Sequence, residues 1–169
     1  MTELELVTAC VLRWFPPRRW AVCANVSWGF LSYEADAVAV SKSNRIHEIE
    51  AKISASDLSR DSRKRKWRQP PQTDYHWYVV QPGLADAATT AAAGTGSGVF
   101  VVEPPPEHGD IGYCKRIVKA RPRRDVVVAA LNRKRDCRNS IWRLASLRYW
   151  NQIVQRLRES NAAVKEPKA

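Results

Sequence analysis

The chain has 169 residues, and its 28 Lys and Arg against 17 Asp and Glu give a formal net charge of +11 at pH 7. No apolar run is long enough to span a bilayer and the start is not signal-like, so we expect a soluble cytoplasmic protein with no membrane contact. The four cysteines show no CxxC spacing, which argues against a zinc site and against a disulfide framework.

The basic charge is concentrated near the end of the chain. Residues 113–158 hold fourteen of the Lys and Arg residues beside two Asp, whereas acidic residues gather earlier. This distribution indicates either a surface that holds an anion such as a nucleic acid or a solvated helix face. The length is typical of one domain, which we predict over residues 1–160, followed by a disordered tail over 161–169.

The first part of the chain predicts a helix followed by three antiparallel strands. Thr2 and Glu5 have the spacing of a capping box, apolar residues follow at helical intervals, and Pro16 ends the helix. Alternating apolar residues then predict strands over 20–28, 33–40 and 45–53. Glu5 or Glu3 could also lean toward a functional site, but capping explains Glu5 better.

Acidic residues gather on the second and third predicted strands. Because alternate residues of a strand share a face, Glu34 and Asp36 point one way, and Glu48, Glu50 and Lys52 point one way on the neighbouring strand. If the two faces coincide, carboxylates converge beside an ammonium group, and oxygen ligands of this kind suit Mg²⁺ or Mn²⁺. The alternative is a solvated sheet face with cross-strand ion pairs, which the apolar residues on the same face disfavour.

The later elements alternate between helix and strand. A basic helix capped by Ser54 or Ser56 precedes a strand whose apolar run suits the centre of a sheet, and His76 within that strand is expected to pack rather than to catalyse. The predicted elements are a helix over 57–67, a strand over 75–81, a flexible low-complexity loop with at most a short helical turn over 83–98, strands over 99–103 and 113–120, and helices between 123 and 157.

Asp36, followed after a short hairpin by Glu50-Ala51-Lys52, resembles the active-site signature of the PD-(D/E)xK nuclease superfamily. The similarity is to a phage and bacterial branch of the superfamily and covers roughly residues 20–125. It rests on four segments, which read HEIEAKISASDLSRDSRKRKW, YHWYVVQPGL, GVFVVE and KRIVKARPR. Ala35 stands where the proline of the superfamily's name is expected. The resemblance implies an α/β fold in which helices flank a central mixed sheet, with a restriction-endonuclease-like core.

The resemblance also implies a metal-dependent DNA endonuclease, acting on repair, recombination or branched intermediates. Asp36, Glu50 and the backbone carbonyl of Ala51 are expected to hold Mg²⁺ or Mn²⁺, with Glu48 or Glu34 completing a second metal shell. Lys52 is expected to orient or deprotonate the attacking water and to stabilise charge on the phosphate. A non-catalytic nucleic-acid-binding protein that has kept the fold is the alternative, and an RNA substrate is a further one.

Basic side chains of the second helix and of the last third of the chain are expected to contact the DNA backbone. The predicted DNA-binding residues are Arg60, Arg63, Lys64, Lys66, Lys115, Arg116, Lys119, Arg121, Arg123 and Arg124. Lys64 also corresponds to a helix residue near the metal in similar nucleases, although a plain basic surface explains it equally well. Trp142, Tyr149 and Trp150 are large enough to form the interface of a homodimer.

Overall fold

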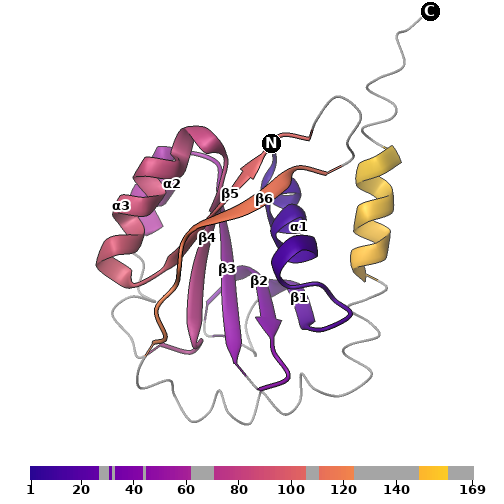
Figure 1. Ribbon diagram of the computed structural model, residues 1–169, viewed down its shortest axis with the longest axis horizontal. Coiled ribbons are helices and arrows are strands. Elements are labelled where there is room, and N and C mark those ends of the chain that lie inside the picture. The colour runs from indigo at the N-terminus through magenta and orange to yellow at the C-terminus, as the bar shows by residue number, and fades with distance from the viewer. Residues whose placement is uncertain are drawn as a thin grey trace, which may run out of the picture.

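The computed structural model describes residues 1–26, 31, 33–43, 45–61, 71–105, 111–123 and 149–159. Within them, six strands form one mixed sheet in the order β1-β2-β3-β4-β5-β6 (Figure 1). The first three strands are antiparallel, β3, β4 and β5 are parallel, and β6 returns antiparallel to β5. The strands are β1 (Ala21–Val26), β2 (Ala35–Val40), β3 (Ile46–Lys52), β4 (Tyr75–Val80), β5 (Gly98–Glu103) and β6 (Tyr113–Val118).

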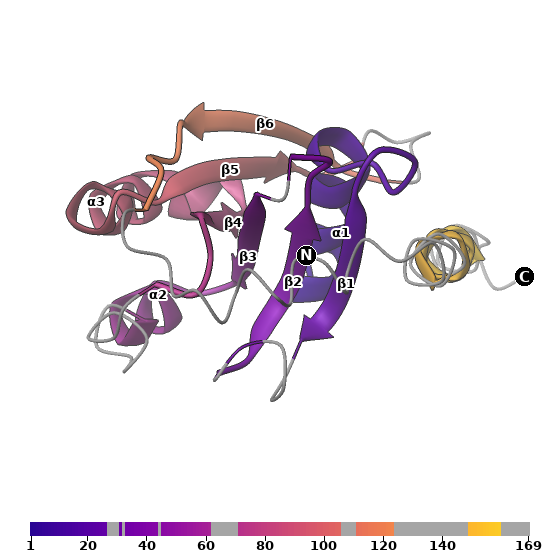
Figure 2. The ribbon, with the colours of Figure 1, turned by 90° about the horizontal axis from the view of Figure 1, so that it is seen from below.

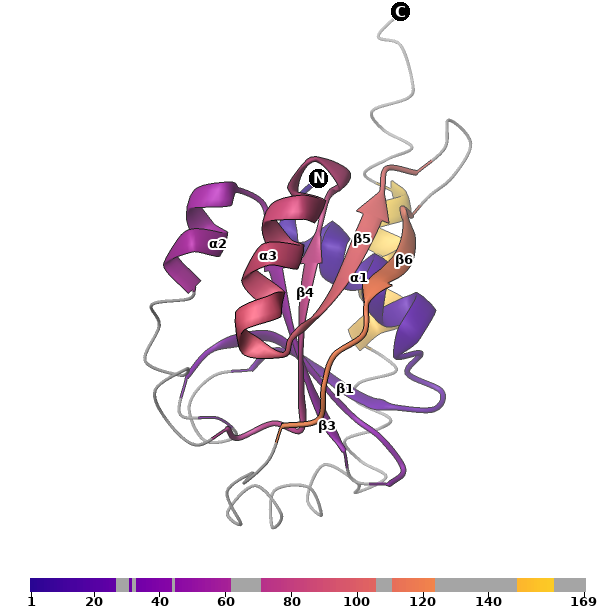
Figure 3. The same cartoon turned by 60° about the vertical axis from the view of Figure 1, so that its left-hand side comes forward.

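Helices lie on both faces of the sheet, which confirms the predicted α/β fold with a central mixed sheet. Helices α2 (Ala55–Asp61) and α3 (Ala85–Thr95) lie together on one side, and α1 (Glu3–Trp14) lies on the other with the helical residues 149–159 (Figures 2 and 3). The predicted central strand is confirmed, because β4 lies between β3 and β5. No helix among these described segments is long and apolar enough to cross a membrane.

Helix α1 begins as its sequence predicts. The backbone N–H of Glu5 donates to Thr2 Oγ1 at 3.3 Å, and the N–H of Thr2 donates to Glu5 Oε2 at 2.6 Å, which completes the capping box. Glu5 therefore serves the helix start and not the acidic strands. The buried face of α1, which includes Leu6, Cys10 and Val11, packs on the sheet.

Aromatic rings fill the space between α1 and the sheet. The Trp77 ring is stacked on Phe100 at 4.6 Å between centroids, and Trp77 Nε1 donates to His47 Nδ1 at 3.0 Å. Burial lowers the pKa of His47 to about 4, so this imidazole is neutral at pH 7 and accepts the indole proton. Strand β3 thus directs His47, Ile49 and Ala51 toward the apolar layer under α1. Its acidic residues therefore point to the opposite face of the sheet.

The predicted flexible loop over 83–98 is wrong. Residues 82–84 form a short 3-10 turn (η2, Pro82–Leu84) that leads directly into α3. Alanine has the highest helix propensity of all residues, and this outweighs the low complexity of the run. Ala88 and Ala92 are buried against β4 and β5, so the helix is held by packing as well. It ends at Gly96, whose φ of 70° is a left-handed conformation that favours glycine.

Two glycines near α3 should respond oppositely to substitution by alanine. A Cβ on Gly98 would lie 2.3 Å from the Trp77 ring and 2.7 Å from the backbone nitrogen of Ala120, whereas a Cβ on Gly94 would meet nothing within 4 Å. We expect Gly98→Ala to lower the free energy of unfolding by about 1–3 kcal/mol or more. Gly94→Ala, within the helix, should raise it by up to about 1 kcal/mol. Urea unfolding of the two variants checks this, and equal effects would contradict the placement of α3 and β5.

The helical residues 149–159 are part of the core. Trp150 is 1% exposed, and its Nε1 donates to the carbonyl oxygen of Val22 at 3.3 Å. The expectation that Trp150 forms a homodimer interface is therefore wrong, because its ring already covers the sheet beside α1. Tyr149 is half-buried against the same core. Trp142, the rest of the predicted terminal helices and the predicted tail lie outside the described residues.

Candidate metal centre

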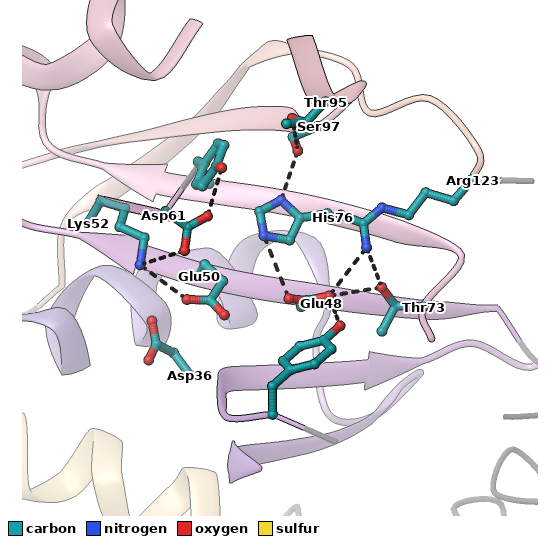
Figure 4. A network of polar contacts seen from close by, with 12 residues as sticks. Asp36, Glu48, Glu50, Lys52, Asp61, Thr73, His76, Thr95, Ser97 and Arg123 are labelled. Atoms are coloured by element: carbon teal, nitrogen blue, oxygen red, sulfur yellow. Dashed lines mark hydrogen bonds and ion pairs between the residues drawn. The ribbon is translucent and has the colours of Figure 1, made fainter. Parts of the chain in front are cut away.

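The polar face of the sheet lies on the side of α2 and α3, and strand β3 supplies its centre. The sequence IHEIEAK alternates, so Glu48, Glu50 and Lys52 share one face. The parallel register of β3 and β4 pairs Glu48 with His76 and Glu50 with Tyr78, which extends the same face onto β4. Figure 4 shows Lys52 directed at Glu50 and His76 directed at Glu48 on this face.

Asp36, Glu50 and Lys52 meet as the sequence predicts. Strand β2 pairs Ala37 with Ile49 in an antiparallel register. The next pair in that register places Asp36 opposite Glu50. The backbone N–H of Ala51 donates to Asp36 Oδ2 at 2.7 Å, and Lys52 Nζ lies 3.2 Å from Glu50 Oε2. Two carboxylates and one ammonium group therefore share a corner of the sheet (Figure 4).

Lys52 is surrounded by acidic groups. Its Nζ lies 3.7 Å from Asp57 Oδ2 and 3.6 Å from Asp61 Oδ1, in addition to the contact with Glu50. Burial lowers the pKa of Lys52, but Glu50, Asp61 and Asp57 outweigh it and hold the pKa above its usual value. Because the group remains protonated, Lys52 is suited to orient and stabilise anions rather than to remove a proton.

Helix α2 delivers two of these acids. Ser54 caps the helix as predicted, accepting from the backbone N–H of Asp57 at 3.2 Å. One turn later Asp61 is fully buried, and it accepts a hydrogen bond from the Tyr78 hydroxyl at 2.9 Å. Asp61 and Tyr78 are not among the site residues predicted from the sequence. The parallel pairing of β3 with β4 brings Tyr78 beside Glu50, so a correct prediction of that pairing would have placed Tyr78 in the site.

The carboxyl group of Asp36 is electrostatically strained. Burial raises its pKa to about 6, with a further contribution from the neighbouring Glu50, while the Ala51 N–H and Lys52 act in the opposite direction. Such a pair of carboxylates is relieved by a cation between them. The donor set fits the ion that the resemblance implies, because Asp36, Glu50 and the backbone beside them offer only oxygen, as Mg²⁺ and Mn²⁺ prefer.

The raised pKa of Asp36 predicts a pH dependence of stability for the metal-free protein. Since the pKa is about 6 in the folded state and about 3.9 in the unfolded state, the proton stabilises the fold below pH 4, and this contribution is lost as the pH rises through 6. Relative to Asp36→Asn, the wild type should lose about 2–3 kcal/mol between pH 4 and pH 7. Denaturant unfolding in EDTA measures the difference, and parallel profiles for the two proteins would contradict it.

Glu48 occupies the most enclosed position of the network. It is fully buried, and its Oε2 accepts from the Tyr33 hydroxyl at 2.7 Å and from the Thr73 hydroxyl at 2.9 Å. Arg123 Nη1 lies 3.5 Å from the same oxygen and donates to Thr73 Oγ1 at 3.1 Å. The expectation that Arg123 faces DNA is wrong, because its side chain is 13% exposed and its guanidinium pairs with Glu48.

The remaining predicted residues are exposed, contact other groups or lie outside the described residues. Glu34 is exposed one residue before β2, and Arg60, Lys119 and Arg121 are exposed. Lys115 pairs with Glu103, and the Arg116 guanidinium lies 5.0 Å from the Trp14 ring centroid, on the α1 side of the sheet. The basic residues that lie outside the described residues are Arg63, Lys64, Lys66 and Arg124.

Comparison with known proteins adds information on the fold. The sequence matches no known family profile and no curated protein. A solved structure of a protein of unknown function from Silicibacter pomeroyi is similar, with a TM-score of 0.60 and 16% sequence identity over 88% of this chain and 92% of that chain. At this identity the likeness shows a common α/β architecture and nothing of the chemistry.

Proposed function

We propose that the protein is a divalent-metal-dependent DNA endonuclease that hydrolyses phosphodiester bonds. The observation that carries the proposal is the meeting of Asp36, Glu50 and Lys52, with an N–H of Ala51 at 2.7 Å from Asp36 and Lys52 Nζ at 3.2 Å from Glu50. Two carboxylates beside a protonated lysine provide both a place for a cation and a positive group for a phosphate.

In this proposal each residue of the corner has one task. Asp36, Glu50 and the Ala51 carbonyl hold Mg²⁺ or Mn²⁺, which when bound polarises the phosphate and lowers the pKa of a water molecule. Lys52 donates hydrogen bonds toward the phosphate oxygens and the attacking water. Asp57 and Asp61 keep Lys52 protonated and fix the direction of its side chain. The strain between Asp36 and Glu50 favours metal binding over the empty carboxylate pair.

The DNA backbone would be held by exposed basic groups near this corner. Arg60 on α2, next to Asp61, is the described candidate at this end of the strands, and the basic residues between 62 and 68 follow it in the sequence. Arg121 is exposed near the opposite end of the strands, where its backbone N–H donates to the carbonyl oxygen of Gly96. Contacts of this kind give salt-dependent and largely sequence-independent affinity. We propose a cytoplasmic enzyme acting on repair, recombination or branched DNA, where cleavage of two symmetric strands would need a homodimer.

A non-catalytic nucleic-acid-binding protein is the second candidate, and the enclosure of the site favours it. The side chains of Glu50 and Lys52 are each 4% exposed, so Asp36 offers the more accessible oxygens of the corner. A binding protein would keep the basic surface and use the buried network only to stabilise the sheet. The two candidates differ in one observable, which is metal-dependent cleavage.

A substrate panel tests the proposal. Duplex, single-stranded, flapped and four-way DNA, with an RNA duplex as comparison, would be incubated with wild-type protein in Mg²⁺, Mn²⁺ or EDTA over a salt series. We expect DNA cleavage that needs the metal and weakens steeply with salt. Binding without cleavage on every substrate would favour the non-catalytic protein, and preferential cleavage of RNA would reassign the substrate.

A further inference from the structure

We propose a second metal site, formed by Glu48, Glu50 and His76, that takes a divalent transition-metal ion of the class of Zn²⁺ or Mn²⁺. Each residue offers one ligand atom, and these atoms all lie within 4.8 Å of one another. The three side chains come from adjacent parallel strands, where the register pairs Glu48 with His76. The inference rests on the proposed function only through Glu50, which the two sites would share.

The separation between Glu48 and His76 suits two ligands of one ion. His76 Nε2 lies 3.7 Å from Glu48 Oε1, which is too long for a hydrogen bond. Two ligand atoms at bond lengths of about 2.0–2.2 Å from a common ion lie roughly 3–4 Å apart, depending on the angle between the bonds. The spacing therefore matches two ligands of one ion, and it equally allows an ion pair when His76 is protonated.

The surroundings of Glu48 and His76 fix which atoms face each other. On Glu48, Oε2 is the oxygen that accepts from Tyr33 and Thr73, so Oε1 is the oxygen directed at His76. On His76, Nδ1 lies 2.9 Å from Ser97 Oγ, which leaves Nε2 toward Glu48 (Figure 4). A hydrogen-bond partner on the second ring nitrogen orients histidines bound to metals, and Ser97 would serve as that partner here.

The chemistry of the donors separates this site from the Asp36 site. An imidazole nitrogen with two carboxylates suits Zn²⁺ and other transition ions, whereas the oxygen donors around Asp36 suit Mg²⁺. Glu48, Glu50 and His76 are at most 3% exposed, so an ion bound among them would be well shielded from water. Arg123 pairs with Glu48 and Lys52 pairs with Glu50, and a bound ion would add a further positive charge beside the two buried carboxylates.

Metal binding rather than activity tests this inference. The full chain would be titrated with Zn²⁺ by calorimetry and loaded with Mn²⁺ for pulsed electron paramagnetic resonance, which detects coupling to the nitrogen of a bound imidazole. We expect a nitrogen-coupled ion in wild type that is retained in Asp36→Asn and lost in His76→Gln. Ser97→Ala, which keeps the imidazole and removes the hydroxyl that orients it, should weaken Zn²⁺ binding by about 10–100-fold.

The outcomes separate this site from the proposed nuclease activity. Absence of a nitrogen-coupled ion in wild type, or its survival in folded His76→Gln, would overturn the inference even if the protein cleaves DNA. Unchanged Zn²⁺ affinity in Ser97→Ala would do the same and does not depend on the folding of His76→Gln. Conversely, a nitrogen-coupled ion in a protein without cleavage would support the site and overturn only the proposed function.

Discussion

Asp36→Asn is expected to lower Mg²⁺-dependent cleavage of DNA by more than about 100-fold while DNA affinity stays within a factor of a few. The amide keeps the shape of the carboxylate and can still accept the hydrogen bond from the Ala51 N–H, so the fold should survive. What it loses is the negative charge that would hold the ion beside Glu50. Initial cleavage rates and filter-binding affinities at fixed salt measure the two effects separately.

Asp86→Asn is the matched control for this variant. Asp86 is exposed in the first turn of α3 and is not among the residues of the network drawn in Figure 4, so the same chemical change should leave cleavage unchanged. If Asp36→Asn cleaves as fast as Asp86→Asn, Asp36 does not hold the catalytic ion and the nuclease proposal must move to other residues.

Lys52→Met is expected to lower the free energy of unfolding by about 3–5 kcal/mol at pH 7, in addition to abolishing cleavage. Removing the ammonium leaves the buried carboxylates of Glu50 and Asp61 without the charge that compensates them. Methionine fills a similar volume, so loss of packing contributes little. The cost should fall at acid pH, where carboxyl groups become neutral, and urea unfolding at pH 4.5 and 7 measures it.

Lys115→Met provides the comparison for the buried lysine. Lys115 pairs with Glu103 at the surface, with 50% of its side chain exposed, and such pairs contribute about 0–1 kcal/mol. Equal losses of stability in the two methionine variants would mean that the buried ion pairs of Lys52 stabilise the fold no more than a surface pair does.

Much of the acidic corner could be predicted from the sequence because strand periodicity is strict. The period of two decides which side Glu48, Glu50 and Lys52 face, and a short antiparallel connection limits how far Asp36 can lie from them. The caps at Thr2 and Ser54 follow from equally local rules, and the structure confirms both.

The remaining features depend on contacts that no local pattern encodes. His76 and Tyr78 join the site because β4 pairs in parallel with β3 after an intervening helix, a long-range choice that periodicity does not specify. Arg123 reaches Glu48 from 75 residues away, so its basic character alone suggested a surface role. The helix before β5 departs from the predicted loop for another reason, because the helix propensity of alanine outweighs the low complexity of the run.

The most direct test of the central claim is to locate Mn²⁺ by anomalous diffraction in crystals of wild-type protein and of Asp36→Asn. The account predicts an ion in contact with carboxylate oxygens of Asp36 and Glu50, beside Lys52, in the wild type, and the loss of that ion in the variant. An ordered Asp36 and Glu50 with no ion between them at millimolar Mn²⁺ would contradict it. An ion that remains between Glu50 and residue 36 in Asp36→Asn, as distinct from one bound at His76, would contradict it as well.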